Sequence, residues 1–256
     1  MPTENPLSLD GEVALVTGGS RGIGAAVAEK FASQGANIVI NSTEKSRSRA
    51  EELVERLKSF GVETLWIPGD ISQEGTGKHL VDQTVEYFGR LGILVHCAGI
   101  TEDDLFIKMT GDRWRKVIDT NLNSAFYVAQ PALRQMQKQR EGSVIFLSSV
   151  VAHGNAGQAN YAASKAGLEG LMRSLALEYA NPKRAIRVNA ISAALVNTDM
   201  AKNLKEEQRT KIISMTPIGR VIEAEEVASV ALFLASSMAS AITGAIIDVD
   251  GGMLRR

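Results

Sequence analysis

Tyr161 and Lys165 lie four residues apart in a stretch, Gln158 to Tyr179, that predicts a helix. This spacing places both side chains on the same helix face, one turn apart. A phenol has a pKa near ~10, so it exchanges protons poorly at neutral pH unless its anion is stabilised. A neighbouring ammonium group stabilises that anion and lowers the pKa. We therefore expect Tyr161 to act as a general acid in a reduction and as a general base in the reverse reaction.

Two serines, Ser148 and Ser149, stand at the end of the predicted strand Ser143–Leu147, before the helix that carries Tyr161. A hydroxyl group at this place can hydrogen-bond a substrate carbonyl oxygen and stabilise the negative charge that develops on it. Position alone leaves both serines as candidates for this role.

A glycine-rich turn, Thr17 to Gly24, connects the apolar strand Val13–Val16 to a helix that reaches Gln34. Such a turn directs free backbone N–H groups and the positive end of a helix dipole at one point, which suits a pyrophosphate. Glycines are needed there because a Cβ atom would obstruct the turn or the approach of the phosphates. Gly18, Gly22 and Gly24 have the spacing G-x-x-x-G-x-G.

The same turn also fits G-x-S-x-G, the nucleophile elbow of α/β-hydrolases, over Gly18–Gly22. That fold places its catalytic histidine late in the chain, after the serine and the acid. The histidines here are His79, His96 and His153, and none falls in about the last hundred residues. The hydrolase interpretation is therefore the weaker one.

Short apolar runs alternate with amphipathic stretches along the whole chain, which predicts right-handed βαβ units and a parallel sheet. We expect a single-domain α/β fold, a doubly wound Rossmann-type sheet with helices on both faces, over residues 11–256, after a frayed tail at residues 1–10. The predicted strands are Val13–Val16, Ala36–Ile40, Val62–Ile67, Ile93–His96, Ser143–Leu147, Ile186–Ala190 and Ala245–Val249. The predicted helices include Lys45–Phe60, Gly75–Phe88, Asp112–Gln139 and Ala224–Ser236, with a polar helical insertion over Asn197–Met215.

Composition narrows the class of protein. The 256 residues carry a formal net charge of −1, which gives no reason to expect a nucleic-acid partner. The one cysteine, Cys97, fits a reducing compartment, and no apolar run is long enough for a membrane span. We expect a cytoplasmic protein without a membrane partner. No metal site is expected, because His96 and Cys97 are adjacent in a strand and point to opposite faces.

The end of the second predicted strand bears on the choice of nucleotide. Many NAD-binding proteins place an acid there for the ribose 2′-hydroxyl. This chain has Asn41, Ser42 and Thr43 instead, with Arg21 in the glycine turn. Lys45 and Arg47 follow the strand. An arginine and neutral hydroxyls favour a 2′-phosphate, so the sequence predicts NADP(H).

The glycine turn together with Tyr-x-x-x-Lys resembles the short-chain dehydrogenase/reductase family over nearly the whole chain after about Leu9. Later segments resemble the family's 3-oxoacyl-acyl-carrier-protein reductases. These segments are Gly157–Tyr161, Gln208-Arg209, Thr216–Arg220, Ile242–Gly244 and Asp248–Met253.

The resemblance implies roles for further residues. The family's serine commonly lies thirteen residues before its tyrosine, which points to Ser148, whereas the local text Ser-Val-Val points to Ser149. We favour Ser149, because a loop absorbs a deletion more readily than a strand end. Asn121 matches the asparagine that holds a water connecting the lysine to solvent, and Lys165 matches the lysine that also binds the nicotinamide ribose.

The expected cofactor-binding residues follow from the same matches. They are Gly18, Ser20, Arg21, Gly22, Ile23, Gly24, Asn41, Ser42, Thr43, Asp70, Ile71, Ala98, Gly99, Tyr161, Lys165, Val196 and Thr198. The chain departs from the family pattern at His96-Cys97, in place of two asparagines, and at Ala193-Ala194, in place of Pro-Gly.

The resemblance implies an NADPH-dependent reductase of 3-oxoacyl thioesters, carried on acyl-carrier protein or coenzyme A, that assembles as a homotetramer. A basic group could receive an acidic carrier protein: Arg134, Lys138 and Arg140 near the end of the long helix, and Arg173 on the next helix. Two alternatives stay open: an NADP-linked dehydrogenase of another alcohol or ketone, such as a sugar or steroid, and a weakly active cofactor-binding subunit.

Overall fold

The structure, a computed structural model, describes residues 5–181, 183, 185–202 and 206–254. Within these residues seven strands form one sheet in the order β3-β2-β1-β4-β5-β6-β7, and every neighbouring pair is parallel. The strands are β1 Val13–Thr17, β2 Asn37–Ser42, β3 Thr64–Pro68, β4 Ile93–His96, β5 Glu141–Ser149, β6 Ala185–Ala193 and β7 Ile246–Val249. The predicted doubly wound α/β fold is confirmed.

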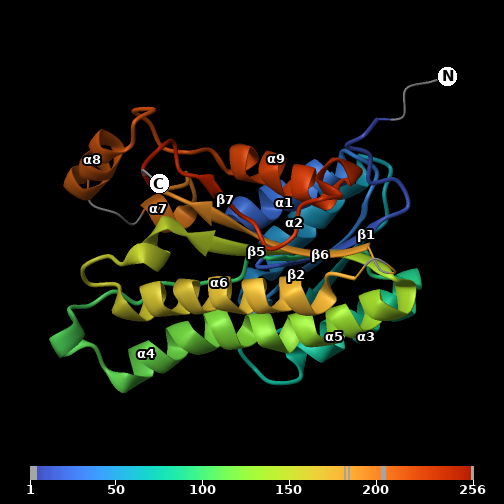
Figure 1. Ribbon diagram of the computed structural model, residues 1–256, viewed down its shortest axis with the longest axis horizontal. Helices are drawn as coiled ribbons and strands as arrows, with labels where there is room; N and C mark the ends of the chain where they lie inside the picture. The colour runs from blue at the N-terminus through green and yellow to red at the C-terminus, as the bar shows by residue number, and fades with distance from the viewer. Residues whose placement is uncertain (1–4, 182, 184, 203–205, 255–256) are drawn as a thin grey trace.

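Helices cover both faces of the sheet (Figure 1). The longer ones are α1 Gly22–Ala32, α2 Arg47–Lys58, α3 Thr76–Phe88, α4 Gly111–Ile118, α5 Ser124–Gln139, α6 Ala159–Tyr179, α8 Glu206–Met215 and α9 Ala224–Ala235, and α7 is the short Asp199–Lys202. One apolar core joins the sheet to α1, α2 and α9, and a second joins it to α3, α5 and α6.

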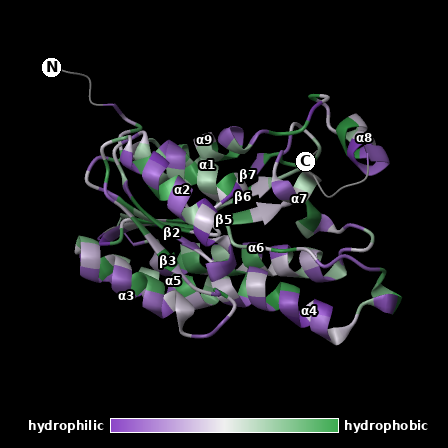
Figure 2. Ribbon diagram, turned by 180° about the vertical axis from the view of Figure 1, so that it is seen from behind, coloured by the Kyte–Doolittle hydropathy of each residue, from purple (hydrophilic) through white to green (hydrophobic). Residues whose placement is uncertain are grey.

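Burial explains why the central strands are apolar without alternation. All five residues of β1 are buried, because helices cover the sheet on both sides. The outer surface is polar, and Figure 2 shows hydrophilic residues along α3 and α4. Short apolar runs without alternation are therefore typical of parallel strands that are buried on both faces.

The N-terminal segment differs from the frayed tail that we expected. Residues 1–4 lie outside the described part, but Leu9 is only 2% exposed and its amide donates to the carbonyl of Gln34 at 2.8 Å. The side-chain amide nitrogen of Asn5 also donates to the side-chain oxygen of Gln34, at 2.9 Å. The Leu9 side chain in the apolar core and the two hydrogen bonds to Gln34 therefore fix this end of the chain.

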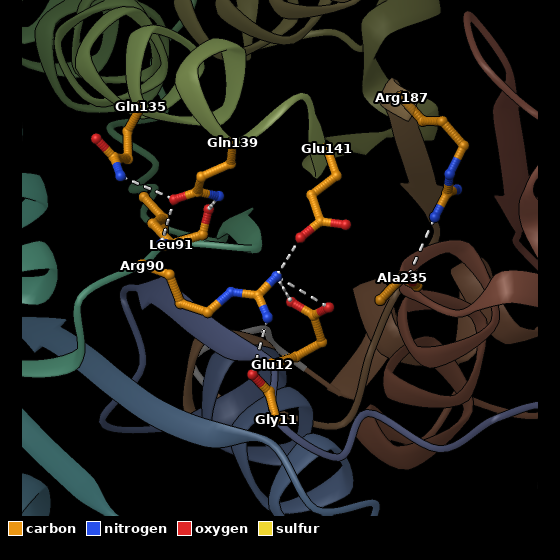
Figure 3. Close-up of polar contacts among 9 residues, drawn as sticks. All are labelled: Gly11, Glu12, Arg90, Leu91, Gln135, Gln139, Glu141, Arg187 and Ala235. Carbon is orange, nitrogen blue, oxygen red and sulfur yellow. Dashed lines mark hydrogen bonds and ion pairs between the residues drawn. The ribbon is translucent and has the colours of Figure 1, made fainter. Parts of the chain in front are cut away.

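Ion pairs fasten the edge of the sheet where its central strands begin (Figure 3). Arg90, just before β4, contacts Glu12 before β1 at 3.2 Å and Glu141 at the start of β5 at 2.6 Å. The Gln139 side chain also pairs with the backbone of Leu91, accepting at 3.0 Å and donating at 2.9 Å. The starts of β1, β4 and β5 are thus held together, far from the edge where the strands end.

Some boundaries differ from expectation for local reasons. The long helix predicted over Asp112–Gln139 is divided into α4 and α5 by a π-helical turn at Asp119–Asn123. Strand β6 runs three residues beyond Ala190, to Ala193, where alanine continues the ladder that a proline would end. The predicted insertion over Asn197–Met215 contains α7 and α8.

Candidate active site

The predicted site residues gather where the strands end. β1 has β2 on one side and β4 on the other, with Thr17 opposite both Asn41 and His96. The chain leaves β1 towards α1 on one face, and α3, α5 and α6 cover the other. In open α/β sheets this reversal of direction opens a crevice for a ligand beyond the strand ends.

Close packing explains two of the motif glycines. Gly18 has φ +64°, and a Cβ there would lie 2.9 Å from the Cα of Ala98. A Cβ on Gly24 would lie 2.4 Å from the carbonyl oxygen of Gly18. The turn therefore lies directly against the end of β4 and the start of α1.

The start of α1 has the features of an anion site. Its N-cap residue, Arg21, makes no side-chain cap, and the first turn carries no acidic residue. Within the part of the chain that the structure describes, no side chain caps the backbone N–H groups there, and the helix dipole adds positive potential. Thr198 stands over this turn, since a Cβ on Gly22 would lie 3.2 Å from its Cγ2.

Two arginines converge beside the turn. The guanidinium of Arg21 lies 4.0 Å from Asp199 and that of Arg49, on α2, lies 3.0 Å from the same carboxylate oxygen. Arg49 was not among the residues we expected from the sequence. Arg47, which was considered, instead pairs with Glu44 and Glu51.

The remaining residues at the end of β2 mainly support the sheet. The Asn41 amide donates to the carbonyls of Ile67 and Gly69 at 3.1 and 3.2 Å, and Ser42 accepts from the indole of Trp66 at 3.1 Å. Thr43 is exposed at the start of the next helical turn. These side chains lie at the predicted edge, but the first two are already engaged with β3.

The other expected nucleotide contacts are also at the strand ends. Ser20 is buried in the turn, and Ile23 packs against the core beside α1. Asp70 accepts from the amide of Ser72 at 3.0 Å and so shapes its own turn, while Ile71 and Val196 are buried.

His96 connects three parts of the site. Its Nδ1 lies 2.9 Å from Thr17 Oγ1 and its Nε2 lies 3.1 Å from Ser124 Oγ. Ser124 donates its own proton to the carbonyl of Thr120 at 2.6 Å, so it must accept from Nε2–H, and Thr17 then donates to Nδ1. Burial lowers the pKa of His96 to about 3, with Lys165 a further cause. A neutral imidazole thus joins the glycine turn, β4 and α5.

The Cys97 thiol stays protonated at neutral pH. Burial raises the pKa of this thiol to about 12. Across the residues that the structure describes, no three His, Cys, Asp or Glu side chains are grouped as metal ligands.

Tyr161 and Lys165 meet as the helical spacing requires. The Lys165 Nζ lies 5.5 Å from the centre of the Tyr161 ring and donates to the carbonyl of Leu147 at 2.6 Å. The Ser149 hydroxyl accepts from the amide of Val151 at 3.2 Å, and Ser149 is the side chain whose interaction with the Tyr161 phenol acts to lower the pKa of that phenol. Ser148 instead donates to Glu169 at 2.9 Å, so the geometry favours Ser149 as the partner of the tyrosine.

Asn121 lies in the π-helical turn and is fully buried. It accepts from the amide of Ile100 at 2.8 Å and donates to Ile100's carbonyl at 3.0 Å and to Ser164 at 3.1 Å. A Cβ on Gly99 would lie 3.4 Å from the Asn121 Oδ1 and 3.6 Å from the Lys165 Nζ. Asn121, Gly99 and Lys165 therefore form one cluster.

The electrostatics of the pair differ from expectation. Burial raises the pKa of Tyr161 to about 12, with a contribution from the Asp103 carboxylate, while the Ser149 hydrogen bond acts in the opposite direction. Burial also lowers the pKa of Lys165 to about 8. The expected lowering by the ammonium group is wrong for this state, because loss of water around both groups outweighs their attraction. Asp103, held by Gln158 at 2.9 Å, was not found by sequence reasoning.

From about pH 8 to about pH 9 the wild-type protein is expected to gain stability relative to Lys165→Met. The folded protein loses the Lys165 proton near pH 8 and the unfolded chain keeps it to near 10.5, so the unfolded state binds more protons. The difference in the free energy of unfolding between the wild type and Lys165→Met should grow by ~1 kcal/mol over this interval. The raised pKa values of Cys97 and Tyr161 act in the opposite direction, but in both proteins, so they do not contribute to this difference. Denaturation at the two pH values measures the effect, and equal slopes for both proteins would contradict it.

Three residues of the basic group that we considered for a carrier protein lie at the wrong edge. Arg134 and Lys138 are in the second half of α5, and Arg140 directly precedes β5. β5 has nine residues, so its two ends are about 26 Å apart, and Ser149 is at the far one. These three residues cannot line the mouth of the site, and the fourth, Arg173 on α6, pairs with Glu169.

Comparisons with known proteins agree with this geometry. The family model described as Enoyl-(Acyl carrier protein) reductase matches residues 18–254. The 3-oxoacyl-[acyl-carrier-protein] reductase of Pseudomonas aeruginosa is 46% identical over 248 residues, which cover 96% of this chain and 99% of that protein. The enzyme of the same name from Staphylococcus aureus is 42% identical over 241 residues, covering 94% and 97%.

A solved structure gives the same result. The crystal structure of a short-chain alcohol dehydrogenase from Sinorhizobium meliloti 1021 superposes with a TM-score of 0.92 at 31% identity, covering 97% of this chain and 98% of that one. The resemblance inferred from the motifs is thereby confirmed, and the chain belongs to the short-chain dehydrogenase/reductase family.

Proposed function

We propose that the protein is an NADPH-dependent carbonyl reductase that converts 3-oxoacyl thioesters, on acyl-carrier protein or coenzyme A, into 3-hydroxyacyl thioesters. The observation that carries the chemistry is the Tyr161 ring 5.5 Å from the Lys165 Nζ, with Ser149 next to the phenol, at the same sheet edge as the glycine turn. The substrate class comes from the names of the relatives that are 41–46% identical.

The residues present fit a nicotinamide dinucleotide. Side chains on Gly18 and Gly24 would fill space that β4 and the turn itself occupy, so the backbone stays bare at this point. The uncapped start of α1 supplies N–H groups for a pyrophosphate, and Gly22, Ile23 and Gly24 carry them. A bound nicotinamide nucleotide would supply the hydride.

The chain's own residues would manage the carbonyl oxygen. Ser149 would donate a hydrogen bond to that oxygen and stabilise its developing charge. Tyr161 would give it a proton, and a pKa of about 12 keeps the phenol protonated at neutral pH. Lys165 would stabilise the phenolate that remains after Tyr161 has given up its proton, and Asn121 would fix the backbone of Ile100 beside it.

Arg21 is proposed to distinguish NADPH from NADH. Arg21→Gln is expected to raise the KM for NADPH by about tenfold to a hundredfold and to leave that for NADH nearly unchanged, because a guanidinium pairs with a phosphate and not with a hydroxyl. Arg47→Gln is the matched control, since Arg47 pairs with Glu44 and Glu51 and should not affect either coenzyme. Equal losses with both coenzymes would contradict the assignment.

The decisive experiment is an assay with the purified protein. Loss of absorbance at 340 nm with NADPH and acetoacetyl-coenzyme A supports the proposal. A trans-2-enoyl thioester should give no comparable rate, and it tests the reaction in the family model's description. A panel of sugars, steroids and simple alcohols tests the alternative of another NADP-linked dehydrogenase. If NADPH binds and no carbonyl is reduced, the protein is a weakly active cofactor-binding subunit.

We further propose that residues 11–256 form one NADP-binding catalytic domain and that the protein is a cytoplasmic homotetramer. Phe126 on α5 is 50% exposed and Leu177 on α6 is 81% exposed, which supports an assembly surface on these helices. No helix among the residues described combines the length and the apolar character of a membrane span. Light scattering on the purified protein measures the assembly, and a monomer would contradict it.

A further inference from the structure

Glu169 is a carboxylate buried one helical turn beyond Lys165. It is only 5% exposed, although glutamate is seldom buried unless it is paired. One of its oxygens accepts a hydrogen bond from Ser148 at 2.9 Å. The other lies 3.3 Å from the guanidinium of Arg173, whose side chain is 55% exposed. Glu169 thus connects the strand on its inner side to a surface arginine on its outer side.

Three successive turns of α6 each hold one of the last three residues of β5. The side chain of Tyr161 contacts that of Ser149, Lys165 donates to the carbonyl of Leu147, and Glu169 accepts from Ser148. Tyr161, Lys165 and Glu169 follow one another at intervals of four, so they share one face of the helix. The catalytic pair and Glu169 therefore belong to one row of contacts.

The position of Ser149 depends on that of Ser148. The two residues are adjacent at the end of β5, so a bond that holds Ser148 against α6 also fixes the backbone from which the Ser149 side chain leaves. Ser148 lies opposite Ser192 in the sheet register, and the Ser192 hydroxyl is buried without a hydrogen-bond partner in the described structure. The Ser148 hydroxyl thus donates to Glu169, although the Ser192 hydroxyl is on the neighbouring strand.

We propose that Glu169 is a positioning residue: through Ser148 it fixes the end of β5 so that the Ser149 hydroxyl stays on the Tyr161 phenol. The inference rests on the proposed reductase function for its kinetic consequence. It gives a residue outside the site control over the position of the end of β5.

Four variants test this in the full-length protein. Glu169→Leu and Ser148→Ala are each expected to lower kcat by about tenfold, since small displacements of a catalytic group are costly. The dissociation constant for NADPH should be unchanged, because neither residue lies at the glycine turn. Glu169→Gln keeps an acceptor oxygen and should restore most of kcat. Arg173→Leu removes only the surface ion pair and should leave kcat within about twofold.

Coupling between Glu169 and Ser148 is the critical result. The double variant Glu169→Leu/Ser148→Ala should lose no more of kcat than either single variant, since both substitutions remove the same contact. Additive losses, or an unchanged kcat in Glu169→Leu, would overturn the inference. A crystal structure of Glu169→Leu decides it independently of activity: the Ser149 hydroxyl should have left the Tyr161 phenol, and an unchanged pair refutes the inference. A wild-type protein without turnover would instead refute the proposed function.

Discussion

Replacing Tyr161 with phenylalanine is expected to lower the rate of carbonyl reduction by about 10³-fold. The phenol is the group that can give a proton to the carbonyl oxygen at the place where Ser149 and Lys165 converge. Phenylalanine keeps the ring and its packing, so Lys165 should retain its hydrogen bond to the carbonyl of Leu147. Binding of NADPH should therefore change by no more than about twofold.

Steady-state kinetics and fluorescence titration with NADPH separate the two effects. Tyr87→Phe is the matched control, because Tyr87 is 57% exposed on α3 and the substitution removes the same hydroxyl group. It should leave both measurements unchanged. If Tyr161→Phe retained a rate near that of the wild type, the proton would have to come from another group, and the proposed mechanism would fail.

The sequence was sufficient where chemistry depends on local spacing. Two predictions of this kind are found in the structure: Tyr161 and Lys165 lie one turn apart on α6, and the glycine turn precedes α1. Each depends only on residues of one helix or one turn, so the spacing in the sequence was enough to predict it. The order of strands follows from alternation of apolar runs with helices, and parallel β-α-β connections restrict the topologies. The predicted fold and the edge that carries the site were therefore accessible without coordinates.

The sequence failed where a property depends on neighbours from distant segments. The raised pKa of Tyr161 comes mainly from burial, with Asp103 adding to it from a loop almost 60 residues earlier. Arg49 meets Asp199 across 150 residues of chain. Residue counts left Ser148 and Ser149 undecided, since only the packing of α6 on β5 shows which hydroxyl faces the phenol.

His96 illustrates a departure from the family pattern that the structure explains. The two asparagines of the family pattern could offer side-chain hydrogen bonds to this sheet edge. His96 instead uses both ring nitrogens, one on Thr17 and one on Ser124. At the second departure, Ala193 extends β6 to the level of Ser149. Neither departure leaves the strand ends without support.

Adding a single methyl group at Gly24 is expected to have the second largest effect. A Cβ there would lie 2.4 Å from the carbonyl oxygen of Gly18, and both atoms belong to backbone segments that no side-chain rotation can separate. Gly24→Ala should therefore push the start of α1 away from the turn. We expect a loss of ~2 kcal/mol in the free energy of unfolding, in the range of overpacked cores.

The displaced helix start should also weaken NADPH binding by at least about tenfold, because the N–H groups of α1 would no longer converge on the pyrophosphate. Gly170→Ala is the control: it lies in α6, and its added Cβ has no heavy atom within 4 Å. Alanine's helix propensity should make that variant ~0.5–1 kcal/mol more stable, with unchanged binding. Denaturation and fluorescence titration measure both quantities. If Gly24→Ala bound NADPH as the wild type does, the nucleotide would not depend on the contact between α1 and the turn, and the phosphate site would have to lie elsewhere on this edge.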